Sequence, residues 1–88
     1  MTAKQNDIYH HIQIDDYSAT PKYVQLANSI IKSMGEGRIK INDTLPSINE
    51  LSFEFEISRD TVEKCYKHLK KIGILGSVPG KGYFIKNT

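Results

Sequence analysis

The sequence predicts a small, mainly helical domain in which three helices are followed by a two-stranded β hairpin. Apolar residues recur at helical spacing in three stretches, each bounded by a capping residue or by glycine. After Gly73 the pattern changes to short apolar runs around a turn rich in proline and glycine. With 88 residues, of which 39% are apolar, the chain can form one packed core but no second domain or large catalytic cleft.

The N-terminal residues divide into an arm and the beginning of the domain. Residues 1–11 are polar and aperiodic, which predicts a flexible arm. The alternation of Ile12, Gln13 and Ile14 predicts a short edge strand, so we expect one domain over residues 12–88. Neither a secretion signal nor a membrane-spanning run is apparent, and we therefore expect a cytoplasmic protein that does not bind membranes.

The first helix is predicted to begin around Thr20 and Pro21, because threonine is a frequent N-cap and proline suits the first helical turn. Gly35 and Gly37 predict its end, since glycine readily adopts the backbone conformation found after helices. The apolar stripe between these signals consists of Tyr23, Leu26, Ala27, Ile30, Ile31 and Met34.

Two further helices are predicted with a short turn between them. Ser47 and Glu50 have the spacing of a capping box, in which each side chain binds the backbone amide of the other residue, so a helix follows Ser47. Ser58 can cap the next helix, which Gly73 ends. Its apolar stripe consists of Val62, Cys65, Tyr66, Leu69 and Ile72. This arrangement is a helix-turn-helix.

The remaining residues predict the hairpin. Two short apolar runs, 74–78 and 83–85, flank the Pro-Gly-Lys-Gly sequence of residues 79–82. Taken alone, such a tip is an ordinary hairpin turn. Because it follows a helix-turn-helix, it is the candidate wing of a winged helix-turn-helix fold, mostly α with a small β wing, which is the fold class that we predict.

The start of the third helix carries residue types that read DNA. Arg59 can give two parallel hydrogen bonds to O6 and N7 of guanine, a pairing worth about 1–3 kcal/mol of discrimination, so we expect it to read a base. The hydroxyls of Ser58 and Thr61 are expected on phosphate. Lys64 is the lysine of this helix best placed to reach the DNA backbone, and Lys81 at the hairpin tip suits the minor groove.

Charge is distributed unevenly along the chain. The net charge of +2 is too small to identify a partner, but acidic residues outnumber basic ones before Arg59. From there on only Asp60 and Glu63 are acidic, against the basic residues Arg59, Lys64, Lys67, Lys70, Lys71, Lys81 and Lys86. We interpret Lys70 and Lys71 individually as solvated surface residues.

The sequence gives little indication of catalysis or metal binding. Cys65 is the only cysteine and lies on an apolar stripe, where a buried core residue is a better interpretation than a nucleophile. His10 and His11 lie in the arm and His68 lies on a helix surface, and no third ligand stands at metal-site spacing from them. We therefore predict a protein that is not an enzyme and that has no metal site and no cofactor.

These motifs together resemble the GntR family of bacterial transcription regulators, in particular its branches related to YtrA and HutC. The segments that carry the resemblance are Leu45-Pro46-Ser47, Ile57-Ser58-Arg59-Asp60-Thr61-Val62, Leu69 to Gly73 and Gly80-Lys81-Gly82-Tyr83-Phe84-Ile85, with Ile14-Asp15, Ser18, Pro21 and Tyr23-Val24-Gln25-Leu26 upstream. The resemblance implies a domain that binds a palindromic operator in double-stranded DNA as a homodimer. It also implies a C-terminal region for effector sensing or dimerisation, which we expect outside these 88 residues.

The resemblance further implies where DNA is contacted. The recognition helix, residues 58–72, lies in the major groove, and the wing tip, residues 79–82, lies at the minor groove. The cap of the second helix contacts phosphate. The DNA-binding residues that we predict are Ser47, Asn49, Ser58, Arg59, Asp60, Thr61, Glu63, Lys64, Gly80 and Lys81.

Two of these residues depart from the family pattern. Asn49 stands where arginine is usual, and Glu63 stands where a basic residue is common. Asn49 can still bond adenine through its amide, whereas Glu63 would repel phosphate or prefer a cytosine amino group, so we expect weaker and shifted recognition. A winged helix used for protein interaction is the open alternative, because a fold does not fix a function. Arg59, Thr61 and Lys81 at contact positions favour DNA.

Overall fold

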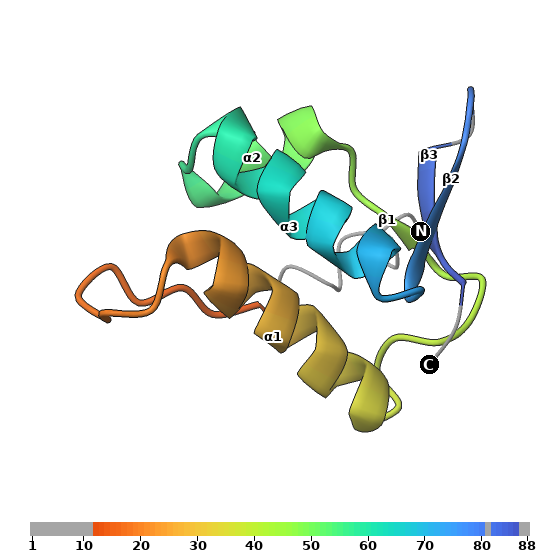
Figure 1. Ribbon diagram of the computed structural model, residues 1–88, viewed down its shortest axis with the longest axis horizontal. Helices are drawn as coiled ribbons and strands as arrows, with labels where there is room; N and C mark the ends of the chain where they lie inside the picture. The colour runs from red at the N-terminus through yellow and green to blue at the C-terminus, as the bar shows by residue number, and fades with distance from the viewer. Residues whose placement is uncertain (1–11, 81, 87–88) are drawn as a thin grey trace.

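The computed structural model describes residues 12–80 and 82–86, so the predicted arm at residues 1–11 lies outside the described residues. Over these described residues, three helices and three strands follow one another in the order α1 (Lys22–Gly35), β1 (Thr44–Leu45), α2 (Ile48–Phe55), α3 (Arg59–Lys71), β2 (Leu75–Val78) and β3 (Gly82–Ile85). In Figure 1, α3 crosses the middle of the domain, packed against α1 and α2, with the sheet beyond its C-terminal end. This arrangement confirms the predicted winged helix-turn-helix fold.

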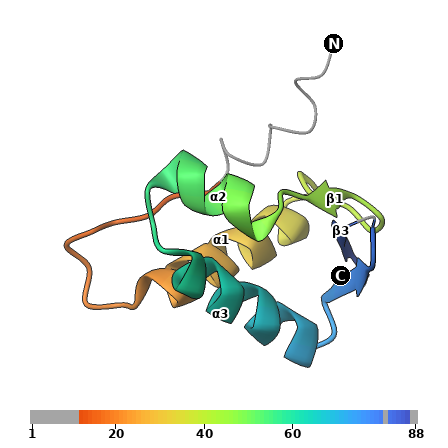
Figure 2. The same ribbon diagram turned by 90° about the horizontal axis from the view of Figure 1, so that it is seen from above.

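The sheet has one more strand than predicted. Its order is β1-β3-β2, and both pairs are antiparallel. Thr44 of β1 pairs with Phe84, and on the other side of β3 Leu75 pairs with Ile85. Strand β1, which lies just before α2, thereby joins the wing to the helix-turn-helix (Figure 2). The sequence did not indicate β1 because two residues are too few to show the alternation typical of a strand.

The edge strand predicted at residues 12–14 is absent, so that prediction is wrong. Ile12 is buried in the core and Ile14 packs against it. The backbone N–H of Gln13 donates to Ser29 Oγ at 3.4 Å, and its carbonyl accepts from the same hydroxyl at 3.5 Å. The alternation arises because the segment runs along α1, with one side toward the core and no neighbouring strand.

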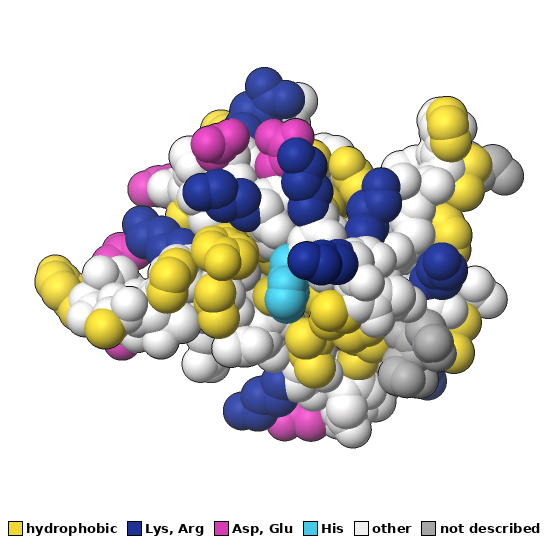
Figure 3. All heavy atoms as spheres, viewed as in Figure 1, with side chains coloured by type: hydrophobic (Ala, Val, Ile, Leu, Met, Phe, Trp, Pro, Cys, Tyr) yellow, Lys and Arg dark blue, Asp and Glu magenta, His cyan; other side chains and the backbone are white. Residues whose placement is uncertain are grey.

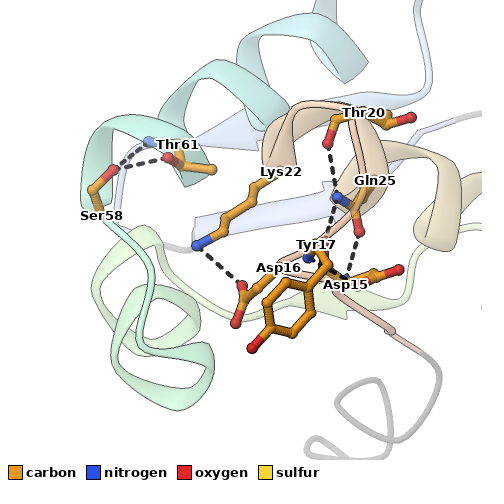
Figure 4. A network of polar contacts seen from close by, with 8 residues as sticks. All are labelled: Asp15, Asp16, Tyr17, Thr20, Lys22, Gln25, Ser58 and Thr61. Atoms are coloured by element: carbon orange, nitrogen blue, oxygen red, sulfur yellow. Dashed lines mark hydrogen bonds and ion pairs between the residues drawn. The ribbon is translucent and has the colours of Figure 1, made fainter.

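The start of α1 also differs from the prediction. Pro21 occupies the N-cap position, and none of the described side chains caps the helix, so Thr20 is not the cap. Gln25 instead ties the preceding loop to the helix, as Figure 4 shows. Its Nε2 donates to the carbonyls of Thr20 (2.8 Å) and Asp15 (3.1 Å), and its Oε1 accepts from the Asp15 amide (2.7 Å). The end of α1 at Gly35 agrees with the prediction.

One hydrophobic core holds the helices and the sheet together. Its buried residues are Ile12, Leu26, Ala27, Ile30, Met34, Ile39, Leu45, Leu51, Val62, Cys65, Tyr66, Leu69, Leu75 and Ile85. The predicted stripes therefore face the core, except at Ile31 and Ile72, which are exposed at their outer margins. Cys65 is fully buried, and this burial raises the pKa of its thiol to about 12, so the thiol stays protonated at neutral pH. The interpretation of Cys65 as a core residue is confirmed.

Both caps of the helix-turn-helix form as the sequence predicts. Ser47 Oγ accepts the Glu50 amide at 3.1 Å, and Glu50 Oε1 accepts the Ser47 amide at 3.0 Å. Glu56 ends α2 in the left-handed conformation, with φ of 54°. Ser58 then caps α3 by accepting the Thr61 amide at 3.1 Å. These bonds fix where α3 begins.

Replacing Ser47 by alanine is expected to destabilise the domain by about 1 kcal/mol, because the amide of Glu50 loses its partner. Thermal unfolding followed by circular dichroism should show a fall in Tm of about 4–8 °C. The control is Thr20→Ala, an exposed threonine just before α1, for which a change within about 0.5 kcal/mol is expected. Equal Tm values for the two variants would contradict a stabilising cap.

Candidate nucleic-acid interface

Three parts of the fold that are distant in sequence point to the same side of the molecule. These are the N-terminal end of α2, the N-terminal end of α3 and the turn between β2 and β3, all directed upward in Figure 1. Ser47 and Ser58 position the two helix ends by capping them. A helix N-terminus presents free amide groups and the positive end of the helix dipole, which favour an anion close to the helix end.

Most of the predicted DNA-binding residues are exposed. Thr61 is half-buried and Lys81 lies outside the described residues. The others are exposed, namely Ser47, Asn49, Ser58, Arg59, Asp60, Glu63, Lys64 and Gly80. None of them belongs to the core, so the fold does not need these side chains for packing.

The two hydroxyls at the start of α3 bond to each other. Ser58 Oγ and Thr61 Oγ1 are 2.8 Å apart, and Ser58 Oγ also accepts the Thr61 amide (Figure 4). The structure thus gives Ser58 a capping role in addition to the phosphate contact expected from the sequence. Its N-cap position holds the free amides of the first turn of α3 at the surface.

The outward face of α3 is charged along its whole length. Figure 3 shows a gathering of lysine and arginine side chains over α3, with acidic side chains among them at one end. Arg59, Asp60, Glu63 and Lys64 are exposed and form no ion pair within residues 12–80 and 82–86. Because the opposite face of α3 is buried, these side chains can only reach outward. They are therefore available to an external partner.

The wing is tied to α3 by a lysine whose role the sequence did not reveal. Lys70 Nζ donates to Ser77 Oγ of β2 at 3.1 Å. The sequence interpretation of Lys70 as a solvated residue is therefore incomplete. No local pattern could have indicated this bond, because it depends on how the hairpin folds back against the helix. The bond links the wing to the C-terminal part of α3.

The wing turn is narrow, and its backbone requires glycine. Gly80 and Gly82 have φ of 82° and 92°, a conformation that other residues rarely adopt. Gly76 of β2 lies against the ring of Phe84, where an added Cβ would be 2.7 Å from Phe84 Cζ. Two glycines of the turn thus allow close approach of the backbone to a partner, and the third allows close packing inside the hairpin.

Tyr66 anchors the recognition helix from the buried side. Its hydroxyl donates to the Pro46 carbonyl at 2.6 Å, and its ring centroid lies 4.6 Å from that of Tyr83 on β3. One side chain therefore links α3 to the residue before the α2 cap and to the wing. The sequence predicted that Tyr66 is a core residue but not that it connects these three parts.

The described residues contain neither a cluster of metal ligands nor a membrane-spanning helix. No group of three or more histidine, cysteine, aspartate or glutamate side chains in residues 12–80 and 82–86 could hold a metal ion. Within the same residues, no helix has both the length and the apolar character needed to cross a bilayer.

Comparison with known proteins identifies the family. A family described as "Bacterial regulatory proteins, gntR family" matches residues 22–85. The HTH-type transcriptional repressor YtrA of Bacillus subtilis (strain 168) is 38% identical over 77 residues, which are 88% of this chain and 59% of YtrA. The chain thus spans less than two thirds of the length of that relative.

Solved structures give the same result. YtrA from Sulfolobus acidocaldarius, a GntR-family transcription factor, is 37% identical and superimposes with a TM-score of 0.81, covering 89% of this chain and 82% of that one. The DNA-binding domain of AraR, in complex with operator ORX1, is 32% identical with a TM-score of 0.74, covering 86% and 98%. The resemblance drawn from the motifs is therefore confirmed: this chain belongs to the GntR family of bacterial regulatory proteins.

Proposed function

We propose that this chain is the operator-reading module of a bacterial transcription regulator. It binds double-stranded DNA in a sequence-specific manner, with α3 in the major groove and the β2–β3 turn at the minor groove. The observation that carries the proposal is the position of Arg59 at the N-terminal end of a helix whose opposite face is buried. Arg59 is exposed there and forms no ion pair with any residue that the structure describes. The AraR domain, solved in complex with an operator, has the same fold and supports this function.

Each exposed residue has a role that fits its chemistry. The planar guanidinium of Arg59 reads guanine through O6 and N7, and the amide of Asn49 reads adenine through N6 and N7. The capped N-termini at Ser47 and Ser58 bind phosphate, with Lys64 as the additional cation on α3.

Four further residues complete the interface, two on α3 and two at the wing. Thr61 supports the phosphate contact of the α3 cap, and Asp60 places a negative charge in the first turn, which stabilises the helix dipole. At the wing, Gly80 permits close approach of the backbone, and Lys81, outside the described residues, reaches the minor groove.

The assembly and its location are part of the proposal. The module binds as a homodimer to two half-sites of a palindromic operator, about 34–36 Å apart as for other helix-turn-helix dimers. A further region of the regulator supplies dimerisation or effector sensing, which the greater length of Bacillus subtilis YtrA supports. The DNA-binding domain comprises residues 12–88, acts in the cytoplasm, and catalyses no reaction.

Selection of bound sequences from a pool of duplexes with a randomised core of about 20 base pairs, two helical turns, tests this function. Enrichment of a palindrome with a guanine in each half-site is expected. A pool that stays random after repeated rounds would contradict sequence-specific binding.

Affinity for DNA should also depend strongly on salt. Each phosphate contact contributes about 0.9 to the slope of log K against log salt, so about three or four contacts predict a 40- to 150-fold loss between 50 and 200 mM. A fluorescence titration of labelled random duplex measures this loss. Absence of salt-sensitive binding would contradict DNA binding and would favour the protein-interaction alternative.

A further inference from the structure

A carboxylate occupies the face of α3 that the proposed function directs into the major groove. Glu63 is exposed and lies one turn after Arg59. Within residues 12–80 and 82–86 its carboxylate forms no hydrogen bond and no ion pair, although Arg59 and Lys67 stand four residues before and after it. The structure therefore leaves its charge without compensation.

Stability of the domain does not explain this carboxylate. The α3 cap is formed by Ser58 and Thr61, and the acidic residue of the first turn is Asp60. Glu63 lies beyond that turn, where the favourable effect of the helix dipole has decayed. Its side chain takes no part in the core. A negative charge at this position serves neither the helix nor its packing.

The buried stripe fixes the direction in which Glu63 points. Val62, Cys65, Tyr66 and Leu69 all face the core, so the rotation of α3 about its axis is set. Residues four apart in a helix lie on one face, about 6 Å apart along the axis. Arg59 and Glu63 are therefore neighbours on the outward face and enter the groove together.

The major groove offers few partners to a carboxylate. Guanine presents O6 and N7 and thymine presents O4, all of which are acceptors that repel a carboxylate. Adenine presents its N6 amino group beside the acceptor N7, whereas cytosine presents the N4 amino group without a neighbouring ring acceptor. Cytosine is therefore the base that a groove-facing glutamate prefers, and guanine and thymine are penalised most.

We propose that Glu63 is a specificity-determining residue that accepts a hydrogen bond from the N4 amino group of a cytosine in the operator. The inference rests on the proposed DNA-binding function. An axial separation of about 6 Å on the helix, against a rise of about 3.4 Å per base, places this cytosine within two base pairs of the guanine that Arg59 reads. The same charge weakens binding to non-cognate DNA, which raises the ratio of specific to non-specific affinity.

The test is a selection from the random duplex pool with the full 88-residue chain and three variants. The wild type is expected to enrich cytosine within two base pairs of the guanine. Glu63→Gln should replace that cytosine by adenine, because glutamine reads adenine through two hydrogen bonds. Glu63→Ala should lose base preference at that position alone.

Glu54→Gln is the matched control, because Glu54 is also exposed but lies on α2. Removing its charge should strengthen binding to all duplexes alike and leave the selected sequence unchanged. Circular dichroism of each variant checks that it is folded. If the Glu63 variants select the same sequence as the wild type, the inference is overturned while DNA binding stands. If no variant and no wild-type chain enriches any sequence, the proposed function itself fails, and the inference with it.

Removal of one amino group from the DNA gives an independent measurement. The cytosine in the selected duplex is replaced by pyrimidin-2-one, which lacks the N4 amino group. Wild-type affinity should fall by about 5- to 150-fold, the equivalent of one base contact, whereas Glu63→Ala should change by less than about threefold. An equal loss for both proteins would show that the amino group acts through base pairing and not through Glu63, which would overturn the inference.

Discussion

Replacing Arg59 by alanine is expected to lower the affinity for the selected operator by about 5- to 150-fold, the equivalent of one bidentate base contact. Arg59 is exposed at the first position of α3 and is in no ion pair within the described residues, so the folded protein holds it ready for guanine. Fluorescence anisotropy with labelled operator and labelled random duplex measures both affinities.

Arg59→Lys separates the effect of the positive charge from the effect of the planar guanidinium group. Lysine keeps the positive charge, so affinity for random duplex should stay near the wild-type value. It lacks the rigid pair of parallel donors, so discrimination for guanine should fall. Lys71→Ala, at an exposed position near the other end of α3, serves as the control and should leave the selected sequence unchanged. Retention of full guanine preference by Arg59→Ala would contradict the role of Arg59.

Replacing Tyr66 by alanine is expected to destabilise the domain by about 3–5 kcal/mol, a large part of the 5–15 kcal/mol typical of small proteins. The substitution leaves a cavity beneath α3, removes the ring contact with Tyr83 and orphans the carbonyl of Pro46. Chemical denaturation measures the loss. The expected consequence for function is loss of DNA binding at temperatures where the variant unfolds.

Tyr66→Phe divides this effect into its parts. Phenylalanine keeps the ring but removes the donor to the buried Pro46 carbonyl, so a loss of about 1–3 kcal/mol is expected. Tyr17→Phe is the matched control, because Tyr17 is 98% exposed and its change should stay within about 0.5 kcal/mol. Equal stability of Tyr66→Phe and the wild type would show that the hydrogen bond does not hold α3 to the turn before α2.

The parts of the fold that could be predicted are those encoded by neighbouring residues. The capping box of Ser47 and Glu50 and the cap at Ser58 involve residues three apart, so the sequence contains the whole interaction. The apolar stripes of α1 and α3 repeat every three or four residues, and most of their members are buried. Ile31 and Ile72 were exceptions because each stripe is wider than the surface that covers it.

The parts that could not be predicted depend on distant contacts. Strand β1 exists because it pairs with β3, some forty residues later in the chain, and residues 12–14 alternate because they lie along α1. The bond from Tyr66 to Pro46 spans 20 residues. The bond from Lys70 to Ser77 requires the hairpin to fold back on the helix. No residue pattern of short range contains this information.

The candidate site was also predicted in part from the sequence and in part only from the structure. Family resemblance and helix position were enough to place Arg59, Asn49 and Glu63 on one accessible surface, and the structure finds them exposed. The structure adds that Arg59 and Glu63 have no ion-pair partner within residues 12–80 and 82–86, which the sequence alone could not establish because lysine stands four residues after Glu63. We expect the side chains of Arg59 and Glu63 to contact DNA bases.

Protection of guanine N7 from dimethyl sulfate on the selected operator tests whether α3 lies in the major groove. N7 of guanine lies in the major groove, where α3 is proposed to bind. We expect the 88-residue chain to protect a guanine in each half-site and Arg59→Ala to abolish this protection. Unchanged methylation of every guanine in the bound operator would contradict insertion of α3 into the major groove.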